Sequence, residues 1–347
     1  MSFEPGPVRT AHRFNEAALE SFLRQSLGSN AGAFSIQQFG GGQSNPTFLL
    51  TLGGDRFVMR KKPPGKLLKS AHQVDREFKI MRALADTDVP VPKMHVLCED
   101  ETIIGTSFYV MEYLEGRIFR DPQLPGLSAD ERAAIYDSMN EVMARLHKVD
   151  IERAGLADFG RPGNYFERQI GRFITQYRAA ETDPIPDMER LIDWMPYNIP
   201  SENSVSIAHG DYRLENTVFH LTEPRLIAVL DWELSTIGHP LADLAYNCMG
   251  YHVMNPRQGG LVGIDHFATG IPSEADYVST YCSRTSRVAI ENWHFYLSFA
   301  VFRLASIAQG VYKRGLDGNA SSENAARFGN TCPMLAENAW RLAQIAS

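Results

Sequence analysis

Residues 209–216 read HGDYRLEN, and this stretch decides the expected fold. It follows the apolar-flanked run SVSIA, and its polar residues do not share the spacing of one helix face: His209, Asp211, Arg213 and Asn216. We therefore expect a loop that leaves the core. The next segment, TVFHLTEPRLIAVLDWE, predicts two short strands around a Glu-Pro turn and contains a second carboxylate, Asp231. A polar loop, a hairpin and another acid could assemble one catalytic site.

The spacing within this stretch suits phosphoryl transfer. A hydroxyl is a poor nucleophile unless a positioned base accepts its proton, and a transferring phosphoryl group needs cations around its charge. Protein kinases place an Asn five residues after the catalytic Asp, and HGDYRLEN has the same frame. Asp211 would then be the base, Arg213 would contact phosphate, and Asn216 and Asp231 would bind Mg²⁺. The alternative is a solvated turn in which Asp211 and Asn216 cap backbone groups.

The composition limits the class of protein. The chain has 347 residues, 44% of them hydrophobic, which is enough for a large core and two lobes. A net charge of −7 and a pI of about 5.8 argue against a broad basic surface for nucleic acid. The four cysteines are scattered without a CxxC pair, which favours reduced thiols in a cytoplasm.

The sequence also predicts a soluble protein without a membrane partner. The N-terminus, MSFEPGPVRTAHRF, lacks the apolar region of a signal peptide. The longest apolar candidate, FYLSFAVFRLASIA, is shorter than the roughly 20 residues that span a bilayer, and it contains Arg303. We therefore expect a cytoplasmic protein.

The order of predicted elements indicates two lobes. Residues 14–29 predict a helix with Asn15 as its cap and Gly28 as its end. Strand-like runs with glycine turns then surround one helix at 71–87, whereas helices dominate after Ser128. The prediction is an α+β, protein-kinase-like fold with two lobes. Its domains would be a nucleotide-binding lobe, 1–114, and a mainly helical lobe, 115–347, with the catalytic loop, metal site and acceptor pocket.

Several motifs together resemble one family. HGDYRLEN, LDWE and GHPLADLAY look like those of the aminoglycoside phosphotransferase and choline-kinase-like family of small-molecule kinases. GGGQSNPTF, FVMRKKPPGKLLKSAHQVDREF and YVMEYLEGR are similar to the kinase-like domains fused to acyl-CoA dehydrogenases, which are linked to phosphorylation of hydroxylated acyl groups, particularly 4-hydroxy acids. The resemblance covers roughly residues 34–250. It implies a protein-kinase-like fold, with ATP and Mg²⁺ as cofactors.

The resemblance also implies which residues hold the phosphates. Glycine backbones in GGGQSN could approach the nucleotide, and the candidate donors are Gly41, Gly42, Gln43, Ser44 and Asn45. A hairpin turn would use the same glycines. Arg60 stands where protein kinases have a phosphate-binding Lys, and its guanidinium can bind two phosphate oxygens. Lys61 or Lys62 could compete for this role, and Glu77 could be the ion-pair partner of Arg60 or an exposed helix acid.

Further positions follow from the same resemblance. The backbone carbonyl of Glu112 and the backbone N–H of Leu114 would bind adenine. Asp243 would support the catalytic loop through hydrogen bonds, and His209 would orient the loop instead of acting as the base. The aromatic residues of the C-terminal third could line an acceptor pocket, but aromatic stripes on helices are more often core.

The mixed charges of the C-terminal third favour some acceptors over others. A polycationic aminoglycoside needs a carboxylate-lined pocket, whereas this region contains both acidic and basic residues. We therefore expect a hydroxy acid or hydroxyacyl thioester as the acceptor, and an aminoglycoside or amino-alcohol as second choice. One alternative is a nucleotide-binding regulatory module without transfer activity, against which the intact Asp211, Asn216 and Asp231 argue. Another is a hydrolase that pairs His209 with Asp211, although the chain has no GxSxG motif.

Overall fold

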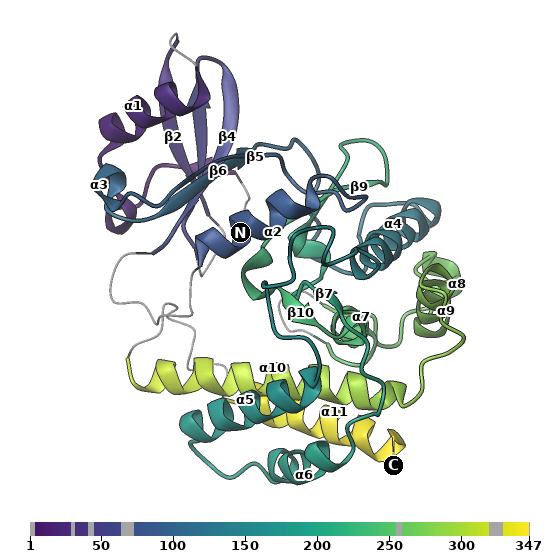
Figure 1. Cartoon of the computed structure of the whole chain (residues 1–347). Helices are drawn as coiled ribbons and strands as arrows, with labels where there is room; N and C mark the ends of the chain where they lie inside the picture. Colours follow the sequence, from purple (N-terminus) through teal and green to yellow (C-terminus); the bar gives the residue numbers. More distant parts are fainter. Residues whose placement is uncertain are drawn as a thin grey trace. The chain divides into compact units, whose positions relative to one another are not determined.

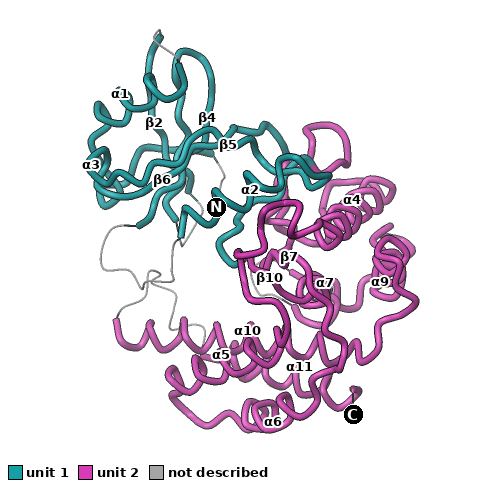
Figure 2. Tube along the Cα trace, viewed as in Figure 1, with its two compact units in different colours: residues 1–116, 227–234 teal, residues 117–226, 235–347 magenta. Residues whose placement is uncertain are grey.

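The structure, a computed structural model, describes residues 4–28, 32–40, 45–63, 73–254, 259–318 and 329–346. The chain divides into two compact units, Met1–Gly116 with Ile227–Leu234, and Arg117–Leu226 with Ser235–Ser347 (Figure 2). Segment 227–234 carries Asp231, so this residue belongs to the first unit. The compact units differ in this segment from the predicted domains, 1–114 and 115–347, which stay a prediction.

Unit 1 is built on a six-stranded antiparallel sheet with the strand order β1-β2-β3-β4-β6-β5. The strands are β1 (Pro5–Gly6), β2 (Phe34–Phe39), β3 (Thr47–Leu52), β4 (Asp55–Lys61), β5 (Met94–Cys98) and β6 (Phe108–Glu112). The helical elements are η1 (Thr10–His12), α1 (Glu16–Leu27), α2 (Val74–Leu84), α3 (Glu101–Ile104) and η4 (Trp232–Leu234). The predicted mixture of strands with one long helix after β4 is confirmed, whereas the short α3 was not predicted.

Alternation along the strands gives the sheet two different faces. On one face, Met59 of β4 and Phe108 of β6 join a core cluster with Leu19 and Leu23 of α1. Because successive side chains point to opposite faces, Arg60 and Tyr109 lie on the other face, where both contact Glu77 of α2. The strand period therefore determines which face receives the buried charge.

The first helix begins and ends where its sequence predicts. The side chain of Asn15 accepts a hydrogen bond from the Ala18 N–H at 3.0 Å, which satisfies one of the free donors of the first turn. Gly28 ends the helix with φ of 70°, a left-handed conformation that costs glycine little. Both cap predictions are confirmed.

Unit 2 is mainly helical. Its helices are α4 (Ala129–His147), α5 (Tyr165–Ala180), α6 (Pro186–Trp194), α7 (Pro240–Cys248), α8 (His266–Thr269), α9 (Glu274–Arg284), α10 (Trp293–Leu316) and α11 (Thr331–Ala346), with 3₁₀ turns η2 (Met195–Tyr197), η3 (Leu214–Asn216) and η5 (Met249–Tyr251). Strand β7 (Ser206–Ala208) pairs with β10 (Thr236–Gly238) in antiparallel register. Figure 1 shows α10 beside α5 and α11, which it contacts along its length.

Both strands and the turn of the hairpin predicted after the catalytic loop are present. Strand β8 (Thr217–Phe219) is followed by a turn in which the His220 N–H donates to the Arg225 carbonyl at 2.8 Å. The chain then continues through β9 (Leu226–Val229), within which it passes from unit 2 into unit 1. The β7–β10 pair was not predicted, because its two strands lie far apart in the sequence and no local turn joins them.

Helix α10 is long and apolar enough to cross a membrane, by length and composition alone. The helix has 24 residues and is therefore longer than FYLSFAVFRLASIA, the apolar run from which the sequence analysis expected no membrane span. However, 78% of its most apolar window is buried inside the protein. Phe295 and Phe299 of this helix are almost fully buried, so their predicted place in the core is confirmed. Such burial is typical of a core helix, so length is weak evidence for a span.

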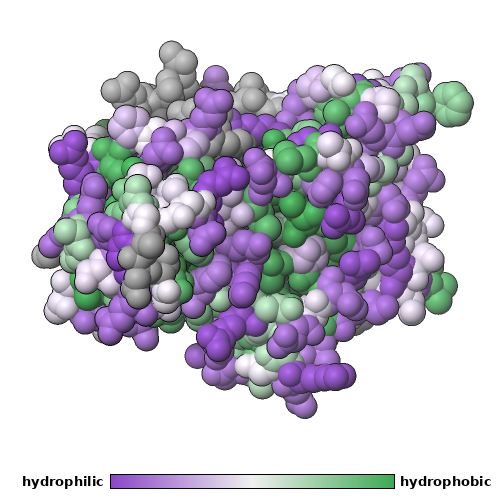
Figure 3. Space-filling view, turned by 90° about the horizontal axis from the view of Figure 1, so that it is seen from above, coloured by the Kyte–Doolittle hydropathy of each residue, from purple (hydrophilic) through white to green (hydrophobic). Residues whose placement is uncertain are grey.

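The exposed hydrophobic residues of the described chain are dispersed. Large apolar side chains reach solvent on several elements, among them Tyr197, Phe267, Val288 and Ile345. On the face shown in Figure 3, hydrophilic residues predominate, with hydrophobic residues among them. Single exposed apolar residues are normal on protein surfaces, so they do not by themselves indicate a partner.

Candidate functional site

Strand β7 leads directly into the catalytic loop of unit 2. Gly210 turns the chain with φ of 84°, a left-handed conformation that L side chains rarely adopt. The 3₁₀ turn η3 then brings Asn216 back toward Asp211. The Asn216 Nδ2 donates to the Asp211 backbone carbonyl at 2.9 Å and to Asp211 Oδ2 at 2.8 Å. The amide and the carboxylate, five positions apart in sequence, are therefore held together.

The backbone of this loop is anchored by a buried carboxylate. Asp243 of α7 accepts the His209 N–H at 2.5 Å and the Gly210 N–H at 2.8 Å. Burial alone would raise the pKa of Asp243, but the hydrogen bond and charge of His147, the charge of His209 and the Gly210 N–H together lower it. His209 itself is fully buried, and its Nδ1 accepts the Asp211 N–H at 3.1 Å. Asp243 and His209 thus hold the loop backbone.

Two residues that the sequence analysis did not assign also contact the loop. Arg303 of α10 donates from Nη2 to the Gly210 carbonyl at 2.5 Å, and its guanidinium lies 5.0 Å from the Tyr246 ring centroid. Burial raises the pKa of Tyr246, as do the charge of Asp211 and a hydrogen bond to its side chain. Tyr246 follows Asp243 by three positions on α7, so helical spacing could have indicated it. The signal for Arg303 was a lone charge in an apolar helix.

Arg213 lies beside the proposed base. Its Nε is 3.3 Å from Asp211 Oδ1, and its Nη1 is 3.1 Å from Glu215 Oε2. The Arg213 side chain is 41% exposed, so solvent screens these pairs and they contribute little to stability. A cation that is loosely held near a carboxylate can turn toward another anion.

Unit 1 contains a second cluster of predicted residues, centred on Arg60. The Arg60 Nη1 lies 2.8 Å from Glu77 Oε2, and both terminal nitrogens donate to Asp231 Oδ1 at 3.1 Å. Glu77 also accepts from Asn45 Nδ2 at 2.7 Å and from the Tyr109 hydroxyl at 2.9 Å. The structure therefore brings four predicted residues together in this unit, Asn45, Arg60, Glu77 and Asp231.

Burial sets the electrostatics of the Arg60 cluster. It would lower the pKa of Arg60, but Glu77, Tyr109 and Asp231 together raise it well above the usual value. Burial also raises the pKa of Glu77 and outweighs the opposing charge of Arg60. We take the pair as ionised, because Glu77 accepts three hydrogen-bonding or ionic partners and Arg60 keeps its proton. A fully buried Glu77 excludes the reading of an exposed helix acid.

Arg60 and the next residue, Lys61, lie on opposite faces of the sheet, as strand alternation requires. Lys61 is buried on the opposite face, where its Nζ lies 5.7 Å from the Phe14 ring centroid, and burial lowers its pKa. Arg60, and not Lys61, is therefore the cation that Glu77 holds. Gly41, Gly42, Gln43 and Ser44 lie outside the described residues.

The backbone of three further predicted residues, Asp231, Glu112 and Leu114, is described in the structure. Asp231 has φ of 64°, a left-handed conformation that is uncommon outside glycine and costs about 1 kcal/mol or more. Such strain clusters at functional sites. Glu112 ends β6, and its N–H donates to the Lys93 carbonyl at 2.8 Å. Leu114 follows two positions later and is half-buried; the adenine-binding roles of both stay predictions.

The oxygen atoms of Asn216 and Asp231, the predicted metal ligands, suit a hard cation such as Mg²⁺ better than a transition metal. Among the described residues, no group of three or more His, Cys, Asp or Glu side chains could hold a metal ion. Mg²⁺ needs no such cage, since it is commonly bound by one or two protein oxygens together with substrate phosphates and waters. The carboxylate of Asp231 and the amide oxygen of Asn216 match that donor set.

Comparison with known proteins identifies similar sequences over most of the chain. A family described as the phosphotransferase enzyme family matches residues 35–274. Acyl-CoA dehydrogenase family member 10 of Mus musculus is 47% identical over 340 residues, covering 97% of this chain and 32% of the relative. Acyl-CoA dehydrogenase family member 11 of Homo sapiens is 45% identical over 346 residues, covering 97% and 44%. The chain thus spans less than half the length of these relatives.

Solved structures are similar over nearly the full chain. A candidate aminoglycoside phosphotransferase from Ralstonia eutropha JMP134 is 50% identical, covers 96% of this chain and 99% of its own, and has a TM-score of 0.88. Spectinomycin phosphotransferase APH(9)-Ia, in complex with ADP and spectinomycin, is 12% identical, covers 94% and 98%, and has a TM-score of 0.63. At that identity the second likeness concerns the fold alone. The predicted α+β, protein-kinase-like fold is confirmed.

Proposed function

Because this chain belongs to the phosphotransferase enzyme family, we propose that it transfers the γ-phosphoryl group of ATP to a hydroxyl of an acyl compound. Membership makes it a small-molecule kinase with an alcohol group as acceptor. The acceptor that we propose is a hydroxy acid or a hydroxyacyl thioester. The observation that carries the proposal is the catalytic loop, in which Asn216 holds the Asp211 carboxylate at 2.8 Å on a backbone anchored by Asp243.

In this proposal Asp211 is the general base. One of its oxygens is held by Asn216, and the Tyr246 hydroxyl also bonds its side chain. A carboxylate fixed in this way can orient the acceptor hydroxyl and accept its proton as the phosphoryl group transfers. Because little covalent chemistry is asked of the protein, positioning supplies most of the rate enhancement.

The remaining residues neutralise the charge of the phosphates. Arg60 already binds one carboxylate oxygen of Asp231 with both terminal nitrogens. A phosphate offers two oxygens to the same pair of donors. Arg213 would contact the transferring group. Asn216 and Asp231 would hold Mg²⁺, which neutralises phosphate charge when bound. The choice of ATP is supported by fold neighbours solved with ADP, such as APH(4)-Ia with ADP and hygromycin B.

The choice of acceptor rests on the relatives. Those that are 45–47% identical to this chain are named acyl-CoA dehydrogenase family members, and they contain a stretch similar to nearly all of it. A kinase stretch within such proteins suits an acyl compound that carries a hydroxyl. An aminoglycoside or amino-alcohol is the second candidate, favoured by the names of the fold neighbours.

A coupled assay of ADP release tests the proposal. Hydroxy acids, hydroxyacyl thioesters and aminoglycosides are supplied separately with ATP and Mg²⁺, and we expect acceptor-dependent ADP release with the hydroxylated acyl compounds. Asp211→Asn should lower the rate by about 10²-fold or more, because general-base catalysis contributes that much. Asp86→Asn, at an exposed position beyond α2, is the matched control and should not change it. Release with aminoglycosides alone would favour the second candidate, and an unchanged rate in Asp211→Asn would remove the base from the mechanism.

A further inference from the structure

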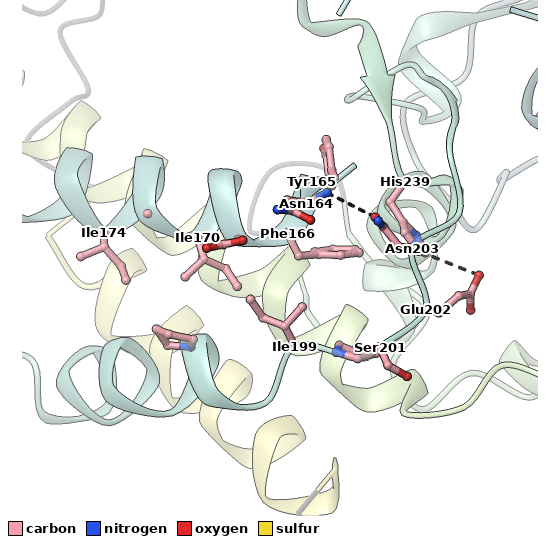
Figure 4. Close-up of a pocket in the computed structure, with 14 residues that line it drawn as sticks. Asn164, Tyr165, Phe166, Ile170, Ile174, Ile199, Ser201, Glu202, Asn203 and His239 are labelled. Atoms are coloured by element: carbon pink, nitrogen blue, oxygen red, sulfur yellow. Dashed lines mark hydrogen bonds and ion pairs between the residues drawn. The ribbon is translucent and has the colours of Figure 1, made fainter. Parts of the chain in front are cut away.

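Unit 2 contains a cavity of about 490 Å³ next to the start of β7. The N-terminal half of α5 forms one wall and segment 196–203 forms the other (Figure 4). Ile170 and Ile174 extend from α5 toward Ile199 on the facing segment, and His239 closes one end. This volume lies within the range of about 300–1,000 Å³ that small-molecule sites occupy.

The cavity is separate from the catalytic loop. Its wall, segment 196–203, precedes β7, whereas the loop begins at His209 after that strand has ended. Antiparallel pairing of β10 with β7 sets Gly238, the neighbour of His239, opposite Ser206. At about 3.3 Å per residue, three strand residues separate the two ends by roughly 10 Å. Of the described residues that line the cavity, none belongs to 209–216.

The cavity walls are mixed, with polar residues such as Asn164, Ser201 and Asn203 beside an apolar stretch. Phe166 and Ile170 are almost fully buried there, and Ile174, Pro196 and Ile199 continue the same lining. Burial of an aliphatic group against these apolar side chains removes apolar surface from water and is therefore favourable. The apolar stretch can receive the apolar part of a ligand.

One side chain at the end of the cavity is a hydrogen-bond donor. The His239 ring is 1% exposed and lies 5.0 Å from the Phe166 ring and 5.7 Å from the Tyr296 ring. Its Nδ1 accepts the Leu241 N–H at 3.2 Å, which places the proton of the neutral ring on Nε2. Burial lowers the pKa of His239 to about 4, against the opposing charge of Glu202, so the ring is neutral near pH 7.

The Nε2 donor has no acceptor at normal hydrogen-bond geometry in the described part of the chain. The Glu202 Oε1 lies 3.9 Å away. The Glu202 backbone is close enough to raise the pKa of His239 as a hydrogen-bond acceptor would, but it does not meet the distance and angle of a normal hydrogen bond. Glu202 is already bound by Arg287 Nη1 at 2.5 Å and Ser204 Oγ at 2.6 Å. A buried donor without an acceptor is unfavourable, so an acceptor on a ligand would be favoured.

We propose that this cavity binds a neutral, apolar compound through a carbonyl oxygen that accepts a hydrogen bond from His239 Nε2. Charge and hydrogen-bonding capacity disfavour the other classes. Glu167 lines the cavity and repels an anion. An ammonium ion gains little from Glu202, because Arg287 already pairs with it, and it offers no acceptor to His239 Nε2. The site is independent of the proposed phosphoryl transfer, since it needs neither ATP nor Asp211.

Three ligands with equal chain length test the proposal in calorimetric titrations without nucleotide. Methyl hexanoate is neutral and carries a carbonyl, hexanoate is an anion, and hexylammonium is a cation. We expect saturable binding of methyl hexanoate, at least tenfold tighter than that of either charged ligand. Equal affinity for all three, or no saturation by methyl hexanoate up to its solubility limit, would overturn the proposal.

Two variants locate the binding. Ile174→Trp fills the cavity from α5 and should abolish binding, whereas Ile192→Trp, at a half-buried position of α6 outside the lining, should leave it unchanged. His239→Asn keeps an oxygen that can cap the Leu241 N–H but loses the Nε2 donor, so affinity should fall about tenfold. If His239→Asn does not fold, the tryptophan pair decides. Binding that survives Ile174→Trp would place the ligand elsewhere and overturn the assignment, whatever the outcome of the kinase assay.

Discussion

At the scale of single residues, both clusters consist of a functional group held by a buried partner. Arg60 is fixed by Glu77, which itself accepts from Asn45 and Tyr109. Asp211 is fixed by Asn216, and Tyr246 adds a hydrogen bond from α7. In the sequence, spacing pointed to Asp211 and Asn216, and the family resemblance pointed to Arg60 and Glu77. The sequence did not identify Tyr109 and Tyr246 as partners, because such contacts depend on how separate elements pack.

Glu77→Gln should destabilise unit 1 and weaken nucleotide binding. The substitution removes one partner of a buried ion pair, which costs about 3 kcal/mol, and it frees Arg60 from one of its two carboxylates. Urea unfolding should show this loss, and the KM for ATP should rise. Glu20→Gln, which breaks the partly exposed pair with Arg24, is the control and should cost less than about 1 kcal/mol. Equal losses in both variants would contradict a structural role for Glu77.

Tyr246→Phe should lower kcat about tenfold and leave the KM for ATP unchanged. The variant removes the hydrogen bond to the Asp211 side chain while the ring and its contact with Arg303 remain, and tenfold corresponds to about 1.4 kcal/mol. Steady-state kinetics with saturating acceptor measures the effect. Tyr251→Phe, which removes a hydroxyl bonded to the Pro272 carbonyl, is the control and should keep kcat. If kcat fell in both variants, the cause would be a general loss of packing, and the positioning role of Tyr246 would be contradicted.

At the scale of elements, helical period and capping residues were sufficient for the long helices. Asn15 and Gly28 mark α1, and the change to helical patterns at Ser128 coincides with the start of α4, where the structure has a capping box. Some short elements were missed, namely β7, β10 and the single turn of α3, whereas the short strands β8 and β9 were predicted from the turn between them. The strand alternation that separates Arg60 from Lys61 was readable from sequence, whereas the choice of face was not, because it depends on where α2 packs.

Helix α10 supports the catalytic loop through Arg303. Arg303→Met should therefore lower the free energy of unfolding by about 2 kcal/mol, because the buried Gly210 carbonyl loses its donor. The kcat should fall as well, since Gly210 precedes the proposed base. Ser306→Ala on the same helix is the control. It removes a hydroxyl that donates to the Phe302 carbonyl within the helix, and it should lower the free energy of unfolding by less than about 1 kcal/mol. Both variants are compared by urea unfolding and steady-state kinetics. An unchanged kcat in Arg303→Met would contradict the claim that Arg303 holds the catalytic loop in place.

At the scale of the whole molecule, the sequence gives no sign that the chain returns to its first unit. Residues 227–234 lie far from residue 116 in sequence, yet they belong to the same compact unit, where Asp231 pairs with Arg60. Such non-local pairing cannot be read from local patterns. Asp231 therefore belongs to unit 1, whereas Asp211 and Asn216 belong to unit 2.

The stability of the protein should fall between pH 6.5 and pH 4 in part because of His239. Its pKa is lowered to about 4 in the folded protein, whereas the unfolded chain takes up the proton near 6.5. The unfolded state therefore binds more protons in this window, and the contribution, about 3 kcal/mol, is lost as the pH falls through it. Urea unfolding at pH 7 and pH 4.5 should show a smaller decrease in His239→Asn than in the wild type. An equal decrease would contradict the buried neutral ring.

The most direct test of the central claim is ³¹P nuclear magnetic resonance of ATP, Mg²⁺ and a hydroxylated acyl acceptor with the protein. The account predicts that a phosphate monoester of the acceptor appears as ADP forms, that chelation of Mg²⁺ stops it, and that Asp211→Asn forms it at least about 10²-fold more slowly. Orthophosphate as the only phosphorus product besides ADP, or an ester that forms equally fast in Asp211→Asn, would contradict it.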